Sequence, residues 1–214
     1  MEENTVIQDH KELRYREFAD NYDKEVRTYN SYGHEVIFGM SYEYINPGEK
    51  LLDIGIGTGL ASILFAEKGL KVFGLDYSKE MLDACKSKSF TEELKLFDIT
   101  KEKIPYRNDF FHHAVCCGVL HFTGNLDQIF SEINRVVRGG GIIAFSFAPH
   151  GLMEDFLMED TDWGVQIFRH SPLYITYLLE KNNMELLKEQ RLLIKGADKI
   201  NFSMQFSVMI CRVL

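Results

Sequence analysis

The sequence predicts an α/β fold built on a mostly parallel β-sheet, and two observations lead to this prediction. Short apolar runs alternate along the chain with segments whose apolar residues recur at helical spacing, as in strands joined by crossover helices. The runs that end at Ile54, Leu75 and Phe97 are each followed by a glycine-rich turn or an aspartate. In a parallel sheet the carboxyl ends of the strands share one edge, where ligands bind. The 214 residues, 45% of them apolar, suit one such domain with a modest appendage.

Charge and hydropathy argue against several classes of partner. The net charge of −8, with no cluster of lysine and arginine, disfavours nucleic acid and anionic membranes. Residues 1–10 lack the apolar centre of a signal peptide, and no apolar run approaches the ~20 residues that a membrane-spanning helix needs. The cysteines show no metal-binding spacing, and we expect them to be reduced core residues: Cys85, Cys116, Cys117 and Cys211. We therefore expect a cytoplasmic protein without a nucleic-acid or membrane partner and without a metal.

The glycine-rich segment after the first strand is the strongest local signal. An apolar strand over Leu51–Ile54 leads into a turn with glycine at alternate positions, 55, 57 and 59, and then into a helix that ends near Gly69. Without side chains, this backbone can approach a ligand at the amino end of a helix. A dinucleotide fingerprint needs a sixth-position glycine, where this chain has Leu60. The turn thus predicts a small ligand other than a dinucleotide, or else only a structural turn.

Two further strands end in acidic residues. The second strand, Lys71–Leu75, ends at Asp76, roughly 20 residues past the glycines, where parallel α/β sheets place a carboxylate against a ribose diol. Ser78 is the expected N-cap of the next helix. A third strand over Leu94–Phe97, approached through a capping segment at 91–93, ends at Asp98.

The order of these motifs resembles that of the class I S-adenosylmethionine-dependent methyltransferases of the small-molecule type. The resemblance covers residues 51–147 and rests on five segments: LLDIGIGTG, VFGLDYSKEML, LFDIT, AVCCGVLHF and INRVVRGGGIIAFSF. It implies a Rossmann-like, doubly wound seven-stranded sheet that is mostly parallel and closes with a C-terminal antiparallel hairpin. It also implies S-adenosyl-L-methionine as the cofactor and methyl transfer by in-line displacement to a small-molecule acceptor.

The resemblance also implies roles for residues that match the family's motifs. Asp53 would orient the ammonium group of the methionine moiety, directly or through water. Asp76 would accept both ribose hydroxyls, and Asp98 would accept the exocyclic amine of an adenine held near Tyr77 and Ile99. The residues expected to contact the cofactor are Asp53, Gly55, Ile56, Gly57, Thr58, Gly59, Asp76, Tyr77, Met81, Asp98, Ile99, Gly118 and Val119.

The rest of the chain predicts the remaining elements of this sheet. The expected strands span 114–117, 142–147, 184–194 and 202–213. The expected helices span 125–137 and about 171–182. The second of these helices has Ser171 as its N-cap and Pro172 at its first position. Residues 1–45 would form a helical lid, residues 46–214 the methyltransferase domain, and residues 148–171 an acidic, methionine-rich substrate cap. Such a cap suits a neutral or cationic acceptor. The alternative for residues 148–171 is a solvated helix that packs Trp163.

Two candidates for catalysis lie outside the glycine loop. His121 follows the fourth strand, and an ordinary histidine accepts a proton near neutral pH. Its alternative role is to shape the loop. In the aromatic-rich segment 11–45, Tyr22 and Tyr29 are the candidates for the methyl-transfer cleft, although these rings would equally serve to pack a helix on the sheet.

His112 and His113 mark a departure from the family, because His112 stands where an aspartate is usual. Neighbouring residues of a strand point to opposite faces, so we expect no metal site here. One histidine should be packed and the other solvated.

Two other functions remain open from the sequence. A nicotinamide-dependent oxidoreductase is disfavoured by Leu60, and a non-catalytic cofactor-binding module is disfavoured because Asp76 and the three glycines are all present.

Overall fold

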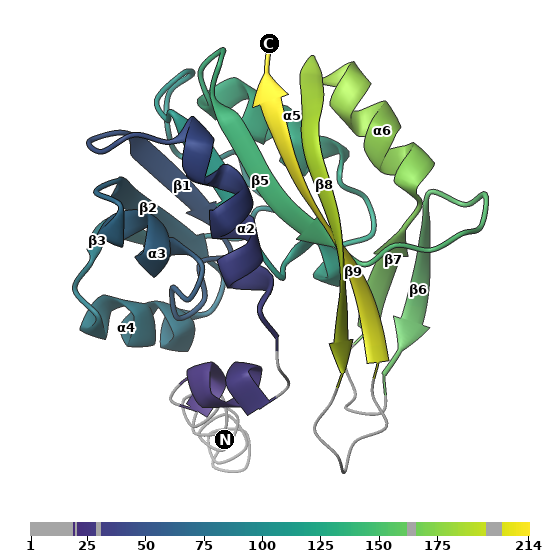
Figure 1. Ribbon diagram of the computed structural model, residues 1–214, viewed down its shortest axis with the longest axis horizontal. Helices are drawn as coiled ribbons and strands as arrows, with labels where there is room; N and C mark the ends of the chain where they lie inside the picture. The colour runs from purple at the N-terminus through teal and green to yellow at the C-terminus, as the bar shows by residue number, and fades with distance from the viewer. Residues whose placement is uncertain (1–18, 20, 29–30, 162–165, 196–202) are drawn as a thin grey trace, which may run out of the picture.

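A seven-stranded sheet forms the centre of the protein (Figure 1), seen in a computed structural model that describes residues 19, 21–28, 31–161, 166–195 and 203–214. The strand order is β3-β2-β1-β4-β5-β9-β8. The first five strands in this order are parallel, and β9 and β8 are antiparallel. The strands span Lys50–Ile54 (β1), Lys71–Asp76 (β2), Thr91–Leu96 (β3), His113–Cys116 (β4), Ile142–Phe147 (β5), Met184–Lys195 (β8) and Ser203–Val213 (β9). This architecture confirms the predicted fold class.

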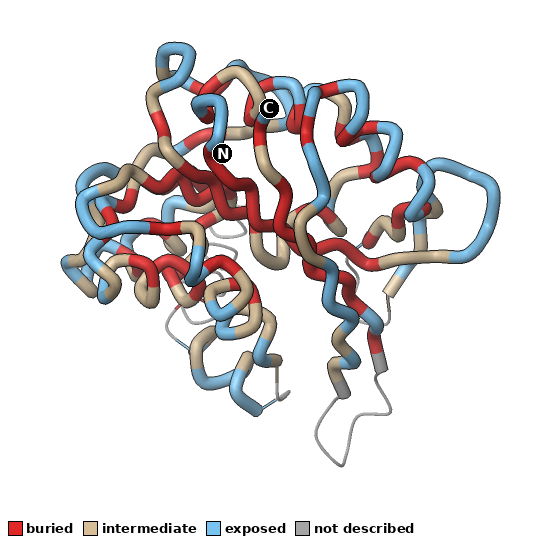
Figure 2. Tube along the Cα trace, turned by 45° about the horizontal axis from the view of Figure 1, so that its top comes forward, coloured by how far each residue is buried: buried red, intermediate tan, exposed pale blue. Residues whose placement is uncertain are grey.

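Helices cover both faces of the sheet, which is why its central strands are apolar throughout. On one face lie α2 (Gly33–Ser41), α3 (Ser62–Glu67) and α4 (Lys79–Ser87), and on the other lie α5 (Asp127–Val136) and α6 (Pro172–Lys181). Alternate residues of β1 enter the two cores, with Leu51 in one and Leu52 in the other. Figure 2 shows the buried residues as a band along the central strands.

The helix starts agree with the predicted capping residues. Ser78 accepts a hydrogen bond from the Met81 N–H at the start of α4, and Ser171 accepts one from the Leu173 N–H ahead of Pro172 in α6. Short 3₁₀ turns lie at Tyr42–Tyr44 (η1) and Leu120–Phe122 (η2), and residues 21–28 are also helical. None of the described helices is long and apolar enough to cross a membrane.

The third strand differs from the prediction. It begins at Thr91 rather than Leu94, so residues 91–93 belong to the strand and do not cap it, and Phe97 lies beyond its end. The reason is position, because β3 pairs only with β2 and forms an edge of the sheet. An edge strand tolerates exposed polar residues such as Glu92 and Glu93, which an apolar pattern does not identify.

The predicted cap segment forms a β-hairpin, so the helical alternative was wrong for the described part of it. Strands β6 (Phe156–Asp160) and β7 (Gln166–His170) pair antiparallel, and Arg169 donates to Glu159 at 2.8 Å across them. The rings of Phe156 and Phe168 occupy the space that a Cβ on Gly124 would need, which places the hairpin against the segment just after η2. Trp163 lies outside the described residues.

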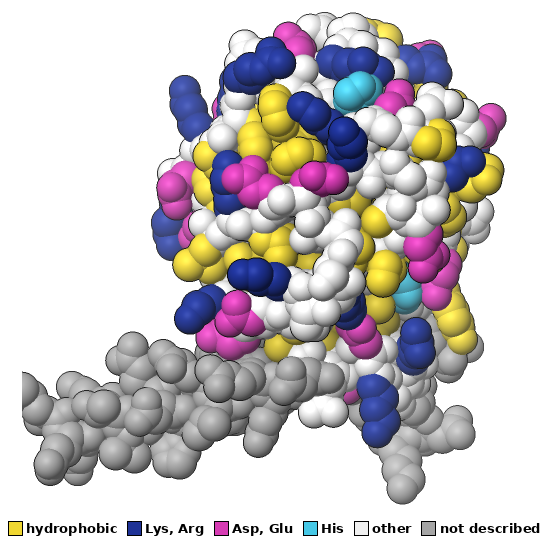
Figure 3. Space-filling view, turned by 90° about the vertical axis from the view of Figure 1, so that its left-hand side faces the viewer, with side chains coloured by type: hydrophobic (Ala, Val, Ile, Leu, Met, Phe, Trp, Pro, Cys, Tyr) yellow, Lys and Arg dark blue, Asp and Glu magenta, His cyan; other side chains and the backbone are white. Residues whose placement is uncertain are grey.

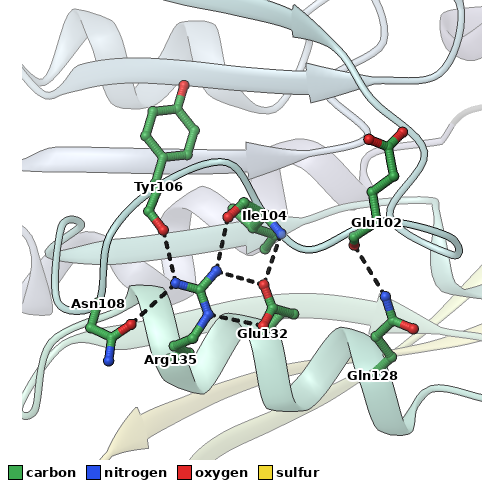
Figure 4. Close-up of polar contacts among 7 residues, drawn as sticks. All are labelled: Glu102, Ile104, Tyr106, Asn108, Gln128, Glu132 and Arg135. Atoms are coloured by element: carbon green, nitrogen blue, oxygen red, sulfur yellow. Dashed lines mark hydrogen bonds and ion pairs between the residues drawn. The ribbon is translucent and has the colours of Figure 1, made fainter.

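An arginine clamp fixes the loop that connects β3 with β4 (Figure 4). Arg135 of α5 donates to the carbonyl oxygens of Ile104 and Tyr106, both at 2.8 Å, and to the buried carboxylate of Glu132. Glu132 also accepts a hydrogen bond from the Ile104 N–H at 2.8 Å. This loop begins with Asp98, at the carboxyl edge of the sheet where the ligand is expected. The clamp therefore helps to fix the backbone of the loop beside that edge.

The two adjacent histidines, His112 and His113, lie at the start of β4, which is at the opposite end of the parallel strands from Asp98. His113 is buried, with Nε2 2.8 Å from Glu49 and Nδ1 accepting a hydrogen bond from the Ile142 N–H. Burial lowers the pKa of His113, and Glu49 partly offsets this. His112 is half-buried and accepts a hydrogen bond from the Lys50 N–H. Both rings support the backbone at the start of the parallel strands.

The surface facing the viewer in Figure 3, past the β3 edge, mixes basic and acidic side chains with apolar ones.

All four cysteines are free, and Cys117 alone among them is only partly buried.

Candidate functional site

The glycine loop after β1 adopts a conformation that requires its glycines. Gly55, Gly57 and Gly59 have φ values of 70°, 55° and 87°, in the left-handed region. A Cβ on Gly55 would lie 2.3 Å from Cγ2 of Val119, and one on Gly59 would lie 2.5 Å from the Phe90 ring. A Cβ on Gly57 would meet no atom within 4 Å. The outer two glycines therefore allow the loop to pack, while Gly57 faces open space.

Asp76 joins the glycine loop to the end of β2. Its carboxylate accepts hydrogen bonds from the Gly57 N–H at 2.8 Å and from the Ser78 N–H at 2.9 Å, one on each oxygen. Burial raises the pKa of this carboxyl group, and the backbone donors, including the Tyr77 N–H, counteract the rise. An ionised carboxylate has about four acceptor positions, so these three backbone donors leave room for a ligand donor.

Asp53 lies at the end of β1 and is 2% exposed. It accepts a hydrogen bond from the Ser62 hydroxyl at the start of α3. Burial raises the pKa of Asp53 to about 7, the Ser62 hydrogen bond opposes the rise, and the nearby Asp76 charge adds to it. A cationic group brought close to this carboxyl group would favour its ionised form.

The residues expected around the adenine are less closely grouped. Asp98 accepts hydrogen bonds from the backbone N–H and the hydroxyl of Thr100 and forms an ion pair with Lys101 at 2.7 Å. Lys101 and Thr100 lower the pKa of Asp98, which keeps it ionised. Ile99 packs against the core cluster that contains α5, whereas Tyr77 is 77% exposed.

Three other residues that were predicted to contact the cofactor make contacts within the protein. Ile56 is buried, and its side chain fills the space beside Gly74. The buried Thr58 donates its hydroxyl to Asp23, and Met81 is held by its N–H to Ser78. Their contact with a cofactor stays a prediction.

Gly118 and Val119 border the site from the end of β4. The Gly118 N–H donates to the Ser146 hydroxyl at 2.9 Å, and the φ of Gly118 is 71°. No atom lies within 4 Å of the position that a Cβ on Gly118 would take. Gly57 and Gly118 thus both present bare backbone to open space.

A helical segment over residues 21–28 lies at the carboxyl edge of the parallel strands (Figure 1). Its Asp23 accepts a hydrogen bond from the Thr58 hydroxyl at 2.5 Å and forms an ion pair with Lys88 at 2.5 Å. Burial, together with the nearby Cys117 thiol and the Asp23 and Asp76 carboxylates, raises the pKa of Tyr22 to about 12. The structure thus brings Tyr22 close to Asp76. Tyr29 lies outside the described residues.

His121, in η2, differs from the ordinary histidine that the sequence analysis assumed. Burial, with a smaller contribution from His170, lowers the pKa of His121 to about 4. The ring packs against Phe122 and Phe206, at centroid distances of 4.1 Å and 5.5 Å. His121 is therefore neutral at pH 7 and a weak base, which does not support the reasoning that made it a general base.

Sequence reasoning missed the partners that hold these residues. Ser62, Lys88 and Ser146 carry no motif, and only the fold brings them to Asp53, Asp23 and Gly118. Asp23 had a signal, because it directly follows Tyr22 in the lid segment.

The fold is an α/β domain that brings bare backbone at Gly57 and Gly118 and the Asp76 carboxylate to the carboxyl ends of its parallel strands. Residues 52–145 match the family model described as "Methyltransferase domain". These residues therefore form a methyltransferase domain, in agreement with the resemblance that the sequence analysis describes.

Curated methyltransferases match a similar part of the chain. The chain is 31% identical over 137 residues to a malonyl-[acyl-carrier protein] O-methyltransferase of Serratia marcescens, covering 64% of this chain and 52% of that protein. The chain spans about half the length of the curated relatives it matches.

Solved structures show the same fold at low sequence identity. A methyltransferase from Methanosarcina mazei has a TM-score of 0.69 at 16% identity, over 82% of this chain and 97% of that one. Magnesium protoporphyrin IX methyltransferase from Synechocystis, solved with S-adenosylhomocysteine bound, has a TM-score of 0.66 at 15% identity, over 88% and 85%.

The residues present fit the cofactor of this family. Gly57 and Gly118 leave open space where side chains would stand, and Asp76 keeps acceptor positions for a sugar diol. Asp53 is a buried carboxyl group that accepts a hydrogen bond from the neutral Ser62 hydroxyl, so it can still respond to a cation.

Proposed function

We propose that this protein binds S-adenosyl-L-methionine at the glycine loop and directs transfer of its methyl group to a small-molecule acceptor. The observation that carries the proposal is the hydrogen bond from the Gly57 N–H to Asp76. It places the one suitably located carboxylate directly beside backbone that faces open space. Asp76 would accept the two ribose hydroxyls, and Gly57 and Gly118 would lie against the ligand.

The bound sulfonium supplies an already activated methyl group, so the protein need only bind and orient the two reactants. Orientation alone can provide effective molarities of about 10⁵ M or more. Asp53 would hold the ammonium group of the amino-acid portion, directly or through water. Tyr22, on the helix tied down by Asp23, would exclude water from above the glycine loop.

A general base is not part of the proposal. His121 lies in the segment after β4, and its pKa of about 4 makes it a weak proton acceptor at neutral pH. A nucleophile that attacks in line and loses its proton to solvent requires no such group.

The acceptor is proposed to be neutral or cationic. The β6–β7 hairpin carries Asp160 and an exposed Met158, and its Glu159 is paired with Arg169, so this hairpin is weakly acidic and adaptable. The Serratia relative is named for a malonyl-[acyl-carrier protein] acceptor, and this chain matches 52% of that protein. We therefore propose only the chemical class of the acceptor.

Calorimetric titration with S-adenosylhomocysteine tests the proposal. The wild-type protein should bind it, and Asp76→Ala should weaken binding at least about tenfold, since two hydrogen bonds to a charged group are lost. Asp83→Ala is the matched control, because Asp83 is exposed on α4, one helix beyond Asp76. It should bind as the wild type does.

Two further titrations separate the rival functions. Binding of NADH in place of S-adenosylhomocysteine would indicate an oxidoreductase. Tight binding of S-adenosylhomocysteine without methyl transfer to any member of a broad acceptor panel would indicate a non-catalytic module.

A further inference from the structure

Strand β8 forms one edge of the seven-stranded sheet (Figure 1). In the described part of the chain it pairs with β9 alone. It has 12 residues, Met184–Lys195, and contains no proline or glycine. The edge of a sheet presents unpaired N–H and C=O groups, which proteins usually block with proline, a bulge or projecting lysines. The ladder of β8 with β9 shifts register between Leu186 and Lys188, and from Lys188 onward it is regular.

The lysine inside this strand does not protect the edge. Its ammonium group donates to the Met40 carbonyl at 3.1 Å, forms an ion pair with Glu43 and lies 5.0 Å from the centre of the Tyr44 ring. Lys188 is therefore held against the face of the sheet that α2 and η1 cover. A long edge strand that is not blocked in this way is a surface on which another strand can pair.

The charge pattern of β8 fits a second copy of the same strand. Two identical strands that pair antiparallel about a two-fold axis place residues at equal distances from the axis opposite each other. Because directly opposite residues share one face of the sheet, the axis passes through a residue and not between two. With the axis at Gln190, Glu189 of each copy lies opposite Arg191 of the other. This register therefore gives two contacts between opposite charges.

Neighbouring positions of the axis are less favourable. At Lys188, Glu189 or Arg191 the axis would place two identical charges opposite each other, which is destabilising. Gln190 is neutral, and its amide group can both donate to and accept from its copy. Among the positions from residue 188 to residue 191, the pattern thus selects Gln190.

Glu189 and Arg191 are available for these contacts. Both are exposed, and within one chain they form a loose ion pair at 3.7 Å. Glu189 also accepts a hydrogen bond from the Ser207 hydroxyl at 2.7 Å. A carboxylate has about four acceptor positions, so Glu189 can also receive Arg191 of a second copy.

Exposed leucines match in the same register. Leu186 is 45% exposed and Leu193 is 58% exposed. They pair with residues 211 and 205 of β9, an even number of positions apart, so both lie on one face of the sheet. About an axis at Gln190, Leu193 of each copy falls opposite the bulge at residues 186–187 of the other. The leucines would thereby be withdrawn from water.

We propose that β8 is the interface of a homodimer, in which two copies pair antiparallel about Gln190 and join their seven-stranded sheets into one continuous sheet. Strands β4, β5 and β9 separate β8 from β1, which leads into the glycine loop. The interface therefore leaves the proposed cofactor site open, and the inference does not depend on the proposed function.

Charge reversal at the two contact residues tests the interface. Sedimentation velocity of the full chain at micromolar concentrations should give the mass of two chains for the wild type. Glu189→Arg places arginine opposite Arg191, and Arg191→Glu places glutamate opposite Glu189, so each should weaken dimerisation by about tenfold. The double variant restores opposite charges and should dimerise as the wild type does.

A mixture of the two single variants separates the interface from an effect within one chain. A heterodimer of a Glu189→Arg chain with an Arg191→Glu chain has opposite charges at both contacts, so the mixture should dimerise more tightly than either variant alone. Mixing does not repair an ion pair that is lost within each chain. Glu92→Arg is the control, because it makes the same charge change at an exposed position of β3, the other edge of the sheet. It should not alter dimerisation.

Three results would overturn the proposal: a wild-type protein that stays monomeric, a dimer that both single variants leave intact, and a dimer that they weaken but the mixture does not restore. Urea unfolding shows whether each variant is folded. Arg191→Glu leaves the hydrogen bond between Ser207 and Glu189 in place, so it still tests the interface if Glu189→Arg does not fold.

Discussion

Asp23 accepts a hydrogen bond from the hydroxyl of Thr58 at 2.5 Å, which ties the helical segment over residues 21–28 to the middle of the glycine loop. The second oxygen of Asp23 pairs with Lys88 at the end of α4. One carboxylate thus joins three segments that are far apart in the sequence, and it does so next to Tyr22.

The first prediction concerns this connection. Asp23→Ala should weaken S-adenosylhomocysteine binding by about tenfold, because part of the binding free energy is then used to order the helix that carries Tyr22. Calorimetry measures the change. Glu25→Ala, an exposed change in the same helical segment, is the control and should have no effect. Equal affinities for the Asp23 variant and the wild type would show that the connection has no role in binding.

The second prediction compares two glycines of similar conformation. Gly57 and Gly140 both have positive φ, 55° and 81°, and neither has an atom within 4 Å of its absent Cβ. Alanine at either position should reduce the free energy of unfolding by about 1 kcal/mol through backbone strain. Only Gly57→Ala should also lose S-adenosylhomocysteine binding, because its methyl group would enter the ligand's space. Loss of binding in Gly140→Ala as well would assign the effect to strain alone.

The third prediction is a pH dependence of stability. Burial raises the pKa of Asp53 to about 7, above its value in the unfolded chain, so its stabilising contribution is present at low pH and is lost as the pH rises through about 7. Asp53→Asn should therefore gain stability relative to the wild type between pH 5 and pH 8, by about 2 kcal/mol. Urea unfolding at both pH values measures it, with Asp83→Asn as the exposed control. A difference independent of pH would mean that Asp53 titrates normally.

The fourth prediction concerns the arginine clamp of Figure 4. Arg135→Met should lower the free energy of unfolding by about 3 kcal/mol, because it leaves Glu132 buried without its partner. The double variant with Glu132→Gln should lose less, since the glutamine oxygen can still accept from the Ile104 N–H without a buried charge. Urea unfolding of the single and double variants gives the coupling. Equal losses would show that the ion pair contributes little to holding the loop.

Much of the fold was predictable because its signals are local. Strand β5 lies at the predicted residues, and Ser78 and Ser171 cap the helices that their positions indicated. Asp76 and the glycines could be placed together because consecutive parallel strands end at one edge.

What could not be predicted depends on contacts between distant segments. The β6–β7 hairpin has no helical or strongly apolar pattern, and its pairing becomes evident only in the folded chain, where Arg169 also forms an ion pair with Glu159. The low pKa of His121 arises from burial under Phe122 and Phe206, which no spacing in the sequence reveals.

A crystal structure of the protein with S-adenosylhomocysteine tests the central claim most directly. We predict that both ribose hydroxyls lie within hydrogen-bond distance of the Asp76 carboxylate and that the ligand contacts the backbone at Gly57 and Gly118. A ligand bound elsewhere, with Asp76 still accepting hydrogen bonds only from backbone N–H groups such as those of Gly57 and Ser78, would contradict the proposed cofactor site.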